Sequence, residues 1–319
     1  MCISYIVVKF IISFKGQEPF GLSPNDNLSH SVLLYVSHSN QTVNFNQARY
    51  ISSQMGKHEN KITLGFTEKD LEKLYQAKPI PSRVNYTITY RMDSTIYFPY
   101  LNYVPLDASH GPDTKYKLPS RNYATGKSKM AAWFVSNCKA SSPRQIYVKE
   151  LSRYIEVDIY GACGTMNCPR KSEAECFALL ESQYKFYLSF ENSLCPDYIT
   201  EKFFINALSH NVIPVVMGAS IEEYKRVAPS HSFIHVDQFQ SPAELANYLK
   251  YLDRNETAYN EYFAWRDHGI INAWTPKPQC VICLLAHIAD KLEPYTFPNV
   301  SKWWNDACIG RKVRRHPFI

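Results

Sequence analysis

The sequence predicts an α/β fold with a parallel, doubly wound sheet in its second half. Two observations lead to this prediction. Between residues 131 and 253, short apolar runs alternate with segments of helical spacing, and such alternation is typical of parallel strands joined by crossover helices. The chain is also 45% hydrophobic and 20% charged, a balance that suits a folded globular protein and excludes a disordered one.

Each element of this half has a local signal. The strands are short apolar runs bounded by turn residues, and three helices are expected to begin at capping boxes opened by Ser142, Ser220 and Ser241. A fourth helix is expected to start at Thr200 and to end at Asn211. The predicted order is strand 131–136, helix 143–153, strand 155–160, strand 186–190, helix 200–211, strand 212–217, helix 220–227, strand 232–236 and helix 242–253.

Residues 185–218 carry the strongest functional signal. In open α/β sheets, ligands bind at the carboxyl ends of the strands, where Glu191, Asn192 and the turn of residues 197–202 are expected. The helix that follows offers free N–H groups to an anion at its first turn. This layout predicts a ligand site.

Two cations break the charge preference of helix N-termini. Arg144 and Lys202 each lie in the first turn of a predicted helix, where a positive charge is unfavourable by about 0.3–1 kcal/mol. A diphosphate bound between them would reverse the sign of both interactions. Alanine at either position is therefore expected to weaken diphosphate binding and to leave thermal stability nearly unchanged. The alternative is that both side chains extend into water.

The sequence divides into two domains joined by a linker. Residues 1–107 are expected to form an N-terminal domain with scattered β-type runs and a helix over residues 68–77. Residues 108–127 are polar and interrupted by prolines and glycines, which predicts a linker. Residues 128–319 form the second domain, which contains the predicted ligand site.

The two ends of the chain give little functional information. Residues 3–14 are apolar but include Lys9, and they are too few for a membrane span, which takes about 20 residues. The formal net charge is +6, and much of it lies in residues 311–319. That run is short and lacks aromatic stacking partners, so a solvated tail is favoured over a nucleic-acid surface.

Cysteines and glycosylation sequons together indicate an oxidising compartment. The chain has nine cysteines, a number that fits disulfides in a luminal protein. Asn-x-Ser/Thr triplets begin at Asn27, Asn40, Asn85, Asn255 and Asn299. Cys280 and Cys283 are expected to form a disulfide, with Cys2 as the unpaired cysteine. A zinc-bound redox or scaffold protein is the alternative that the cysteine pairs leave open.

The segment FYLSFENSLCPDYITEKFF, residues 186–204, resembles the signature of the α1,3-fucosyltransferases, glycosyltransferase family 10. VNYTITYRMDSTIYFPY at residues 84–100 is similar to that family's Tyr-Arg-x-Asp-Ser segment. The resemblance covers roughly residues 84–285. It implies a GT-B architecture, in which two Rossmann-like domains face a central cleft, with an N-terminal domain that is incomplete or divergent.

The resemblance also assigns the donor site. It implies that Arg144, Asn192, Tyr198, Glu201 and Lys202 bind GDP-fucose. Arg144 and Lys202 would hold the diphosphate, and Glu201 would accept hydrogen bonds from a sugar hydroxyl. A second set of cleft residues, ranked below these, consists of Tyr90, Arg91, Asp93 and Ser94.

The catalytic base is the least defined part of the site. Family members resemble one another in a glutamate within a Glu-x-Pro segment, and this sequence has none before residue 84. Glu68 is the candidate base, with Glu59 as a second option and a capping role for Glu68 as the alternative. A homologue that binds a GDP-sugar or a glycan without catalysis therefore stays open.

The remaining expectations concern the acceptor and the cell compartment. The resemblance implies inverting transfer to a GlcNAc of glycoprotein N-glycans. The segment GACGTMNC at residues 161–168 resembles invertebrate members of the family. This likeness favours the core GlcNAc as acceptor over the antennal GlcNAc used by Lewis-type enzymes. No metal is required, although Mn²⁺ is expected to stimulate transfer. No nucleic-acid partner is expected. The resemblance implies the Golgi lumen and a type II membrane anchor, which is not evident in this sequence.

Overall fold

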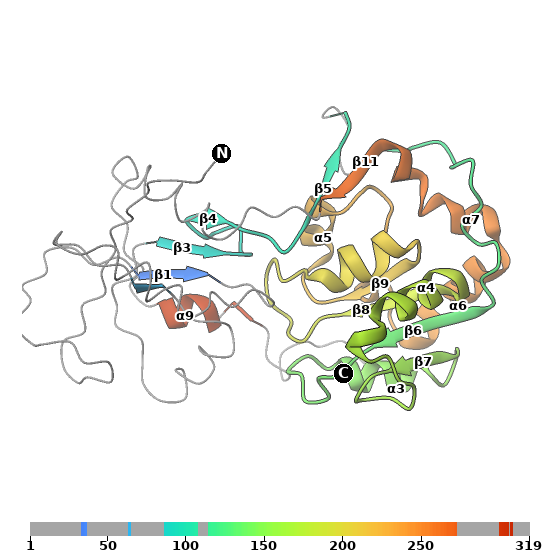
Figure 1. Cartoon of the computed structure of the whole chain (residues 1–319), viewed down its shortest axis with the longest axis horizontal. Helices are drawn as coiled ribbons and strands as arrows, with labels where there is room; N and C mark the ends of the chain where they lie inside the picture. The colour runs from blue at the N-terminus through green and yellow to red at the C-terminus, as the bar shows by residue number, and fades with distance from the viewer. Residues whose placement is uncertain are drawn as a thin grey trace, which may run out of the picture. The chain divides into compact units, whose positions relative to one another are not determined.

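The computed structural model describes residues 33–36, 63–64, 86–107, 114–272, 300–305 and 307–308. The chain forms two compact units (Figure 1). The smaller unit comprises Met1–Pro99 and Thr275–Ala307, and the larger comprises Tyr100–Trp274 and Cys308–Ile319. The division thus lies before residue 100 rather than at the expected linker, and a segment near the C-terminus belongs with the first unit.

The larger unit is built on a parallel sheet of five strands in the order β10-β9-β8-β6-β7. This confirms the predicted parallel sheet and all of its predicted strands, with small shifts of their ends. The strands are β6 (Lys129–Phe134), β7 (Val157–Tyr160), β8 (Tyr184–Phe190), β9 (Ile213–Met217) and β10 (Ile234–His235).

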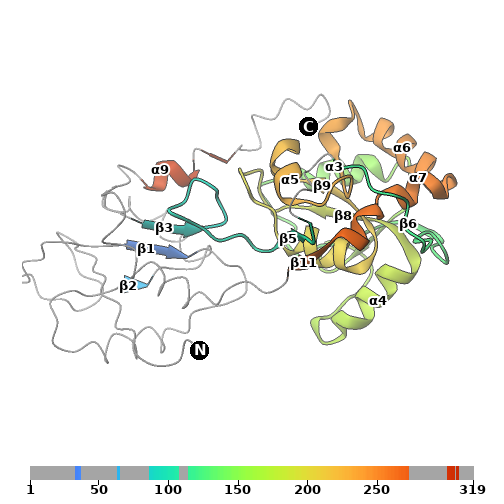
Figure 2. The same ribbon diagram turned by 90° about the horizontal axis from the view of Figure 1, so that it is seen from above.

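Helices cover both faces of this sheet, which explains why its central strands are buried throughout and mostly apolar. Every residue of β8 and β9 is buried, as expected for strands covered on both sides. One face packs against α3 (Arg144–Leu151) and α6 (Pro242–Arg254), and the other against α4 (Glu173–Gln183). Figure 2 shows α3 and α6 on one side of the sheet and α4 on the other.

The predicted helix starts are partly confirmed. At α5 (Ile221–Val227), Ser220 forms a full capping box with Glu223. Ser241 accepts a hydrogen bond from the Glu244 N–H and so caps α6. The predicted cap at Ser142 is wrong, because its hydroxyl donates to the main-chain oxygen of Glu191, 2.6 Å away, instead of binding its own helix.

Helix α4 was not predicted from the sequence. Only Cys176 and Leu180 of its eleven residues are buried, and the apolar Leu179 is exposed, so apolar residues do not mark a single face of the helix. A disulfide joins Cys176 to Cys168, which precedes the helix. Two further short helices complete this part of the unit, α7 (Glu256–Glu261) and the 3₁₀ helix η5 (Ala264–His268).

Two segments at the edge of the larger unit pair as an antiparallel ribbon. Strand β5 (Asn102–Pro105) pairs with β11 (Gly269–Asn272). Residues 114–127 of the predicted linker form no helix or strand. They are nevertheless packed, because the Tyr123 N–H donates to the Asn260 side chain at 2.7 Å and its ring stacks on Phe263.

The described part of the smaller unit contains a parallel sheet of order β2-β1-β3-β4 and a helix. These elements are β1 (Leu33–Val36), β2 (Thr63–Leu64), β3 (Tyr86–Thr89), β4 (Ile96–Tyr97) and α9 (Val300–Asn305). The predicted helix over residues 68–77, together with Glu59 and Glu68, lies outside the described residues.

Three disulfides are present in the described residues. They join Cys138 to Cys163, Cys168 to Cys176 and Cys195 to Cys308. The predicted Cys280–Cys283 pair lies outside the described residues and stays a prediction. Within the described ranges, no helix is both long and apolar enough to cross a membrane.

Candidate functional site

The strand order places a topological switch point between β6 and β8. The chain leaves β6 toward β7 on one side, whereas it leaves β8 toward β9 on the other. The loops after these two adjacent strands therefore diverge, and the gap between them is the usual ligand site of an open α/β sheet. The loop after β6 leads to Arg144, and the loop after β8 leads to Lys202.

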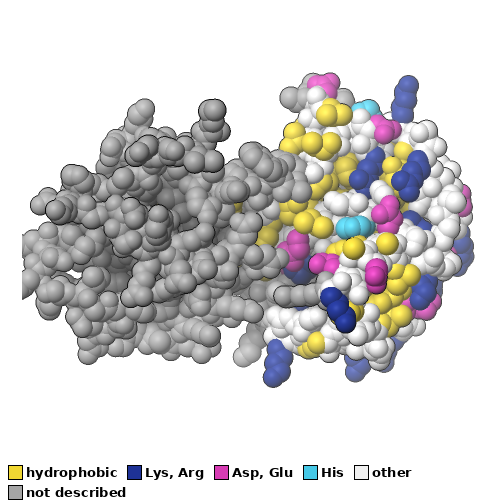
Figure 3. Space-filling model, viewed as in Figure 1, with side chains coloured by type: hydrophobic (Ala, Val, Ile, Leu, Met, Phe, Trp, Pro, Cys, Tyr) yellow, Lys and Arg dark blue, Asp and Glu magenta, His cyan; other side chains and the backbone are white. Residues whose placement is uncertain are grey.

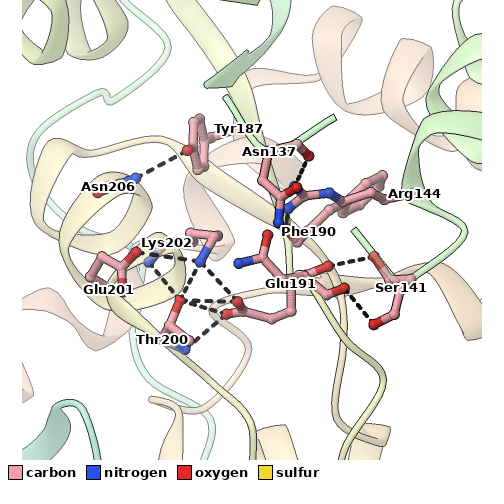
Figure 4. A network of polar contacts seen from close by, with 12 residues as sticks. Asn137, Ser141, Arg144, Tyr187, Phe190, Glu191, Thr200, Glu201, Lys202 and Asn206 are labelled. Carbon is pink, nitrogen blue, oxygen red and sulfur yellow. Dashed lines mark hydrogen bonds and ion pairs between the residues drawn. The ribbon is translucent and has the colours of Figure 1, made fainter. Parts of the chain in front are cut away.

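Arg144 connects the two loops. Its guanidinium donates to the main-chain oxygen of Phe190 at 2.9 Å and of Asn137 at 2.7 Å, and the side chain is buried (Figure 4). The Nε atom has no partner among the described residues. Burial lowers the pKa of Arg144, and the nearby Glu191 carboxylate opposes that shift. The residue thus holds a positive charge between the ends of β6 and β8.

Glu191 is the buried acid of the site, and the sequence analysis placed it at the strand end without assigning it a role. Its carboxylate accepts hydrogen bonds from the N–H and hydroxyl of Thr200, both at 2.8 Å, and from the Lys202 ammonium at 3.0 Å. No part of the Glu191 side chain is exposed. Burial raises the pKa of Glu191, and the Lys202 charge acts against that rise.

The Lys202 ammonium has three protein acceptors. They are Glu191 at 3.0 Å, the Thr200 hydroxyl at 2.8 Å and Glu201 at 3.3 Å (Figure 4). Burial alone would lower the pKa of Lys202, but Glu191 and Glu201 outweigh it and raise that pKa above its ordinary value. An ammonium has three N–H donors, so a new ligand must replace one of these acceptors.

The segment after Thr200 is a π-helix, η2 (Lys202–Ala207), followed by a short 3₁₀ helix, η3 (Leu208–His210). The helix predicted to start at Thr200 is present, but it is a π-helix rather than an α-helix. The Thr200 hydroxyl accepts from the Lys202 main-chain N–H at 3.4 Å and also bonds to Glu191 and to the Lys202 ammonium. The left-handed end at Asn211 is confirmed, with φ of 51°. Single π-turns are frequent at functional sites.

Asn192 and Tyr198 occupy the loop between the strand and the π-helix. The main-chain oxygen of Asn192 accepts from the Ser142 N–H at 2.8 Å and the Ser141 hydroxyl at 3.1 Å, while its side chain is partly exposed. The Tyr198 ring is buried and packs edge-on against Tyr100. Asn192 therefore joins the two loops, and Tyr198 anchors the turn before Lys202.

Two further ties hold this turn, and sequence reasoning missed both. Asp197 has a φ of 58°, its N–H donates to Glu223 at 3.0 Å, and its carboxylate pairs with Arg226 at 3.2 Å. The disulfide from Cys195 to Cys308 fixes the start of the turn. No local signal reports these ties, because the partners in α5 and at residue 308 are distant in sequence.

The four second-ranked residues lie in the smaller unit and are strongly partnered. Arg91 donates to Asp93 at 2.8 Å and to the main-chain oxygen of Trp303 at 2.7 Å, and its guanidinium lies 4.2 Å from the Trp303 ring centre. Ser94 bonds to Thr89, and the Tyr90 ring packs against Trp304. Burial acts to raise the pKa of Asp93, but hydrogen bonds from Arg91 and Trp303 lower it overall.

These contacts explain why helix α9, within Thr275–Ala307, belongs to the smaller unit. The Trp303 indole N–H donates to Asp93 at 2.8 Å, across 210 positions of sequence. The cluster of Arg91, Asp93 and Trp303 thus joins strand β3 to helix α9. A role for these residues in the donor cleft stays a prediction.

The face of the larger unit that Figure 3 shows has no patch of one charge sign. On the face in Figure 3, basic and acidic side chains are interspersed rather than gathered in one patch. Among the described residues, no group of three or more His, Cys, Asp or Glu side chains could hold a metal ion.

The chain is similar to a well-defined enzyme family. The family model described as glycosyltransferase family 10 (fucosyltransferase), C-terminal part, matches residues 124–303. Glycoprotein 3-alpha-L-fucosyltransferase A of Drosophila melanogaster is 47% identical over 239 residues, which is 74% of this chain and 46% of that protein. Alpha-(1,3)-fucosyltransferase fut-1 of Caenorhabditis elegans is 35% identical over 72% of this chain and 54% of its own length.

A solved structure has the same fold. The crystal structure of an α1,3-fucosyltransferase with GDP-fucose matches with a TM-score of 0.50 at 18% identity, covering 89% of this chain and 95% of that one. This likeness concerns the fold alone. The chain spans about half the length of the curated relatives it matches.

Proposed function

Because the chain belongs to glycosyltransferase family 10, the fucosyltransferases, we propose that it transfers L-fucose from GDP-β-L-fucose in α1,3-linkage to a GlcNAc of glycoprotein N-glycans, with inversion at the anomeric carbon. The architecture proposed for the whole enzyme is GT-B, with two Rossmann-like domains that face one cleft. Recognition of the diphosphate by Arg144 and Lys202, without a required metal, is part of the proposal.

The observation that carries this proposal is the position of Lys202. Its ammonium lies at the switch point of the parallel sheet, held by the buried Glu191, and Arg144 supplies a second cation between the same two strands. A departing nucleoside diphosphate is stabilised by fixed cations in a site that excludes water. In this account Lys202 contacts the diphosphate, and Arg144 mainly orients the loops that surround it.

When the donor binds, an exchange of hydrogen-bond acceptors at Lys202 would couple recognition of its diphosphate to recognition of its fucose. Glu201 is its longest and most exposed partner, at 3.3 Å with 34% of the side chain exposed. A diphosphate oxygen that takes the place of Glu201 leaves that carboxylate free to accept a hydrogen bond from a fucose hydroxyl. Tyr198 and Asn192 line the same pocket in this proposal.

The attacking hydroxyl needs a base, which supplies roughly 10²–10⁴ in rate. Glu68 stays the candidate, and Glu59 the comparison residue. Glu68→Gln is expected to abolish transfer and to preserve GDP-fucose binding, whereas Glu59→Gln is expected to change little. Parent-like transfer by Glu68→Gln would remove Glu68 from the mechanism.

The core GlcNAc of N-glycans is the proposed acceptor, supported by similarity to a relative named glycoprotein 3-alpha-L-fucosyltransferase A. Antennal GlcNAc is the second candidate. A homologue that binds the donor without catalysis is a third, because the sequence before residue 84 lacks the Glu-x-Pro segment. The proposed place of action is the Golgi lumen, with Mn²⁺ as a stimulant rather than a requirement.

One experiment tests the function and the acceptor together. The purified chain is incubated with GDP-fucose and a panel of N-glycans that offer either a core or an antennal GlcNAc, and the products are read by mass spectrometry. Fucosylated core GlcNAc supports the proposal, and fucosylation of antennae alone changes the acceptor. Tight GDP-fucose binding without any product would favour the inactive homologue, and absence of both would overturn the donor assignment.

A further inference from the structure

Asn255 joins helix α6 to helix α7 and begins the sequon Asn255-Glu256-Thr257. It is the one of the five sequons that falls within the described residues. Its backbone is extended, with φ of −122° and ψ of 90°, and Thr257 is exposed. An oligosaccharide-transferring enzyme needs an accessible amide and hydroxyl in such a connection.

The hydrogen bonds of the Asn255 side chain are compatible with a sugar on Nδ2. Its Oδ1 accepts from the Ala258 N–H at 3.0 Å, which caps α7, and its Nδ2 donates to the Tyr251 hydroxyl at 3.1 Å. A primary amide has two N–H donors on Nδ2. Replacement of one hydrogen by a sugar therefore leaves both the capping oxygen and one donor in place.

A shallow hollow of about 450 Å³ lies beside this side chain. It is lined by Asn247, Lys250, Tyr251, Arg254 and Asn255. Tyr251 is 50% exposed as a residue, although large aromatic residues usually bury most of their area. An apolar ring surrounded by hydrogen-bond donors suits a sugar, which offers C–H groups on one face and hydroxyls at its rim.

The hollow lies at the opposite edge of the sheet from the switch point. In a parallel unit, each crossover helix begins at the carboxyl edge of the strands and ends at the amino edge. A direct contact confirms this placement, because Lys185 near the start of β8 donates to the Asp253 main-chain oxygen at 2.8 Å and pairs with its carboxylate. A glycan on Asn255 would therefore leave the donor site open.

We propose that Asn255 is an N-glycosylation site and that the first sugar of its glycan packs on Tyr251 in this hollow. The three disulfides of the described residues favour an oxidising secretory compartment, where the modification takes place. In the reaction, a bond forms between Nδ2 and the anomeric carbon of an oligosaccharide, the bond from that carbon to a lipid diphosphate breaks, and the amide proton leaves with the diphosphate.

The test uses the full chain secreted from a eukaryotic cell, followed by glycopeptide mass spectrometry. The expected result is a glycan on Asn255 in most molecules. Thr257→Ala should abolish it, and Thr257→Ser should keep it, while both variants retain the capping side chain of Asn255. An unmodified Asn255 in secreted, disulfide-bonded parent protein would overturn the proposal.

The contact with Tyr251 has its own readout. Loss of the glycan in Thr257→Ala, compared with the glycosylated Thr257→Ser, is expected to lower the Tm by about 2–4 °C, the shift that corresponds to about 1 kcal/mol in a domain of this size. In a Tyr251→Ala background the same pair of variants should differ much less in Tm, with the occupancy of Asn255 in the Thr257→Ser protein unchanged. Equal Tm shifts with Tyr251 present and with Tyr251→Ala would contradict packing of the sugar on Tyr251. The GDP affinity of Thr257→Ala should equal that of the parent, because the hollow and the donor site lie at opposite edges of the sheet.

Discussion

The ammonium of Lys202 lies 3.0 Å from the carboxylate of Glu191, a side chain with no exposed surface. Removal of one member of a buried ion pair leaves the other charge without compensation, at a cost of about 3–5 kcal/mol. This relationship changes an expectation drawn from the sequence. Alanine at Lys202 is no longer expected to leave thermal stability unchanged, and neither is alanine at Arg144, which binds two main-chain oxygens.

Lys202→Met is therefore expected to destabilise the protein by about 3–5 kcal/mol. The double variant Glu191→Gln/Lys202→Met removes both charges and should recover most of that loss. Chemical denaturation of the parent, the single variant and the double variant measures the three free energies of unfolding. Lys225→Met is the matched control, since Lys225 pairs at the surface with Glu222. A loss of unfolding free energy in Lys202→Met no greater than in Lys225→Met would contradict a buried ion pair between Lys202 and Glu191.

Glu201→Gln is expected to separate binding of GDP from binding of the sugar. Loss of a partly exposed acceptor of Lys202 should raise GDP affinity by about two- to five-fold, since such pairs are worth about 0.2–1 kcal/mol. The transfer rate should fall by about 10- to 100-fold, because a hydrogen bond to a charged group contributes about 1.5–3 kcal/mol. Calorimetry with GDP and a transfer assay provide the two values, and a parallel fall in both would argue against acceptor exchange.

The disulfide between Cys195 and Cys308 is expected to matter for the donor site. The double variant Cys195→Ser/Cys308→Ser should lose about 2–5 kcal/mol of stability and bind GDP more weakly, because Cys195 starts the turn that carries Tyr198 and Lys202. Cys168→Ser/Cys176→Ser is the control, since that bridge closes a loop of sequence separation 8 before α4. Equal GDP affinities in the two variants would show that the bridge does not order the turn.

Lys127 gives a prediction for the pH dependence of stability. Its ammonium donates to the main-chain oxygens of Tyr184 and Asn211, and burial lowers the pKa of Lys127 to about 7. An unfolded lysine has a pKa of about 10.4, so between these values the unfolded chain binds more protons. The free energy of unfolding should then rise with pH above about 7, by at most about 1.4 kcal/mol per pH unit.

Denaturation at pH 7, 8 and 9 tests this behaviour. Lys127→Met should flatten the rise, while Lys139→Met, at an exposed position, should keep it. The neutral amine retains hydrogens for both carbonyl oxygens, so deprotonation removes the buried charge without loss of those bonds. The same slope in the parent and in Lys127→Met would disprove a lowered pKa in the folded state.

The sequence predicted those structural elements whose formation is decided by residues close to them in the chain. The apolar runs of β6 to β10, the capping box at Ser220 and the left-handed Asn211 all have causes within a few residues, and the structure contains each. The signature segment also predicted that Arg144 and Lys202 come together, because strand ends of a parallel sheet share one edge, and the structure places both beside the ends of β6 and β8.

Tertiary partners decided what could not be predicted. Ser142 has the sequence of a helix cap, but the oxygen of Glu191 on the adjacent strand end takes its hydroxyl. The Thr200 hydroxyl likewise binds Glu191, and the turn that follows is a π-helix rather than the predicted α-helix. Trp303 and Arg91 are joined across 212 positions, and no periodicity or spacing in the sequence reports such a contact.

The most direct test of the donor site is a calorimetric titration of GDP into the parent and into Glu191→Gln/Lys202→Met. The double variant is expected to fold with nearly the stability of the parent, so a change in affinity reports the lost cation rather than unfolding. The parent should bind one GDP per chain, and the double variant should bind it about 10- to 100-fold more weakly. Equal GDP affinity in the two folded proteins would contradict the assignment of Lys202 to the diphosphate.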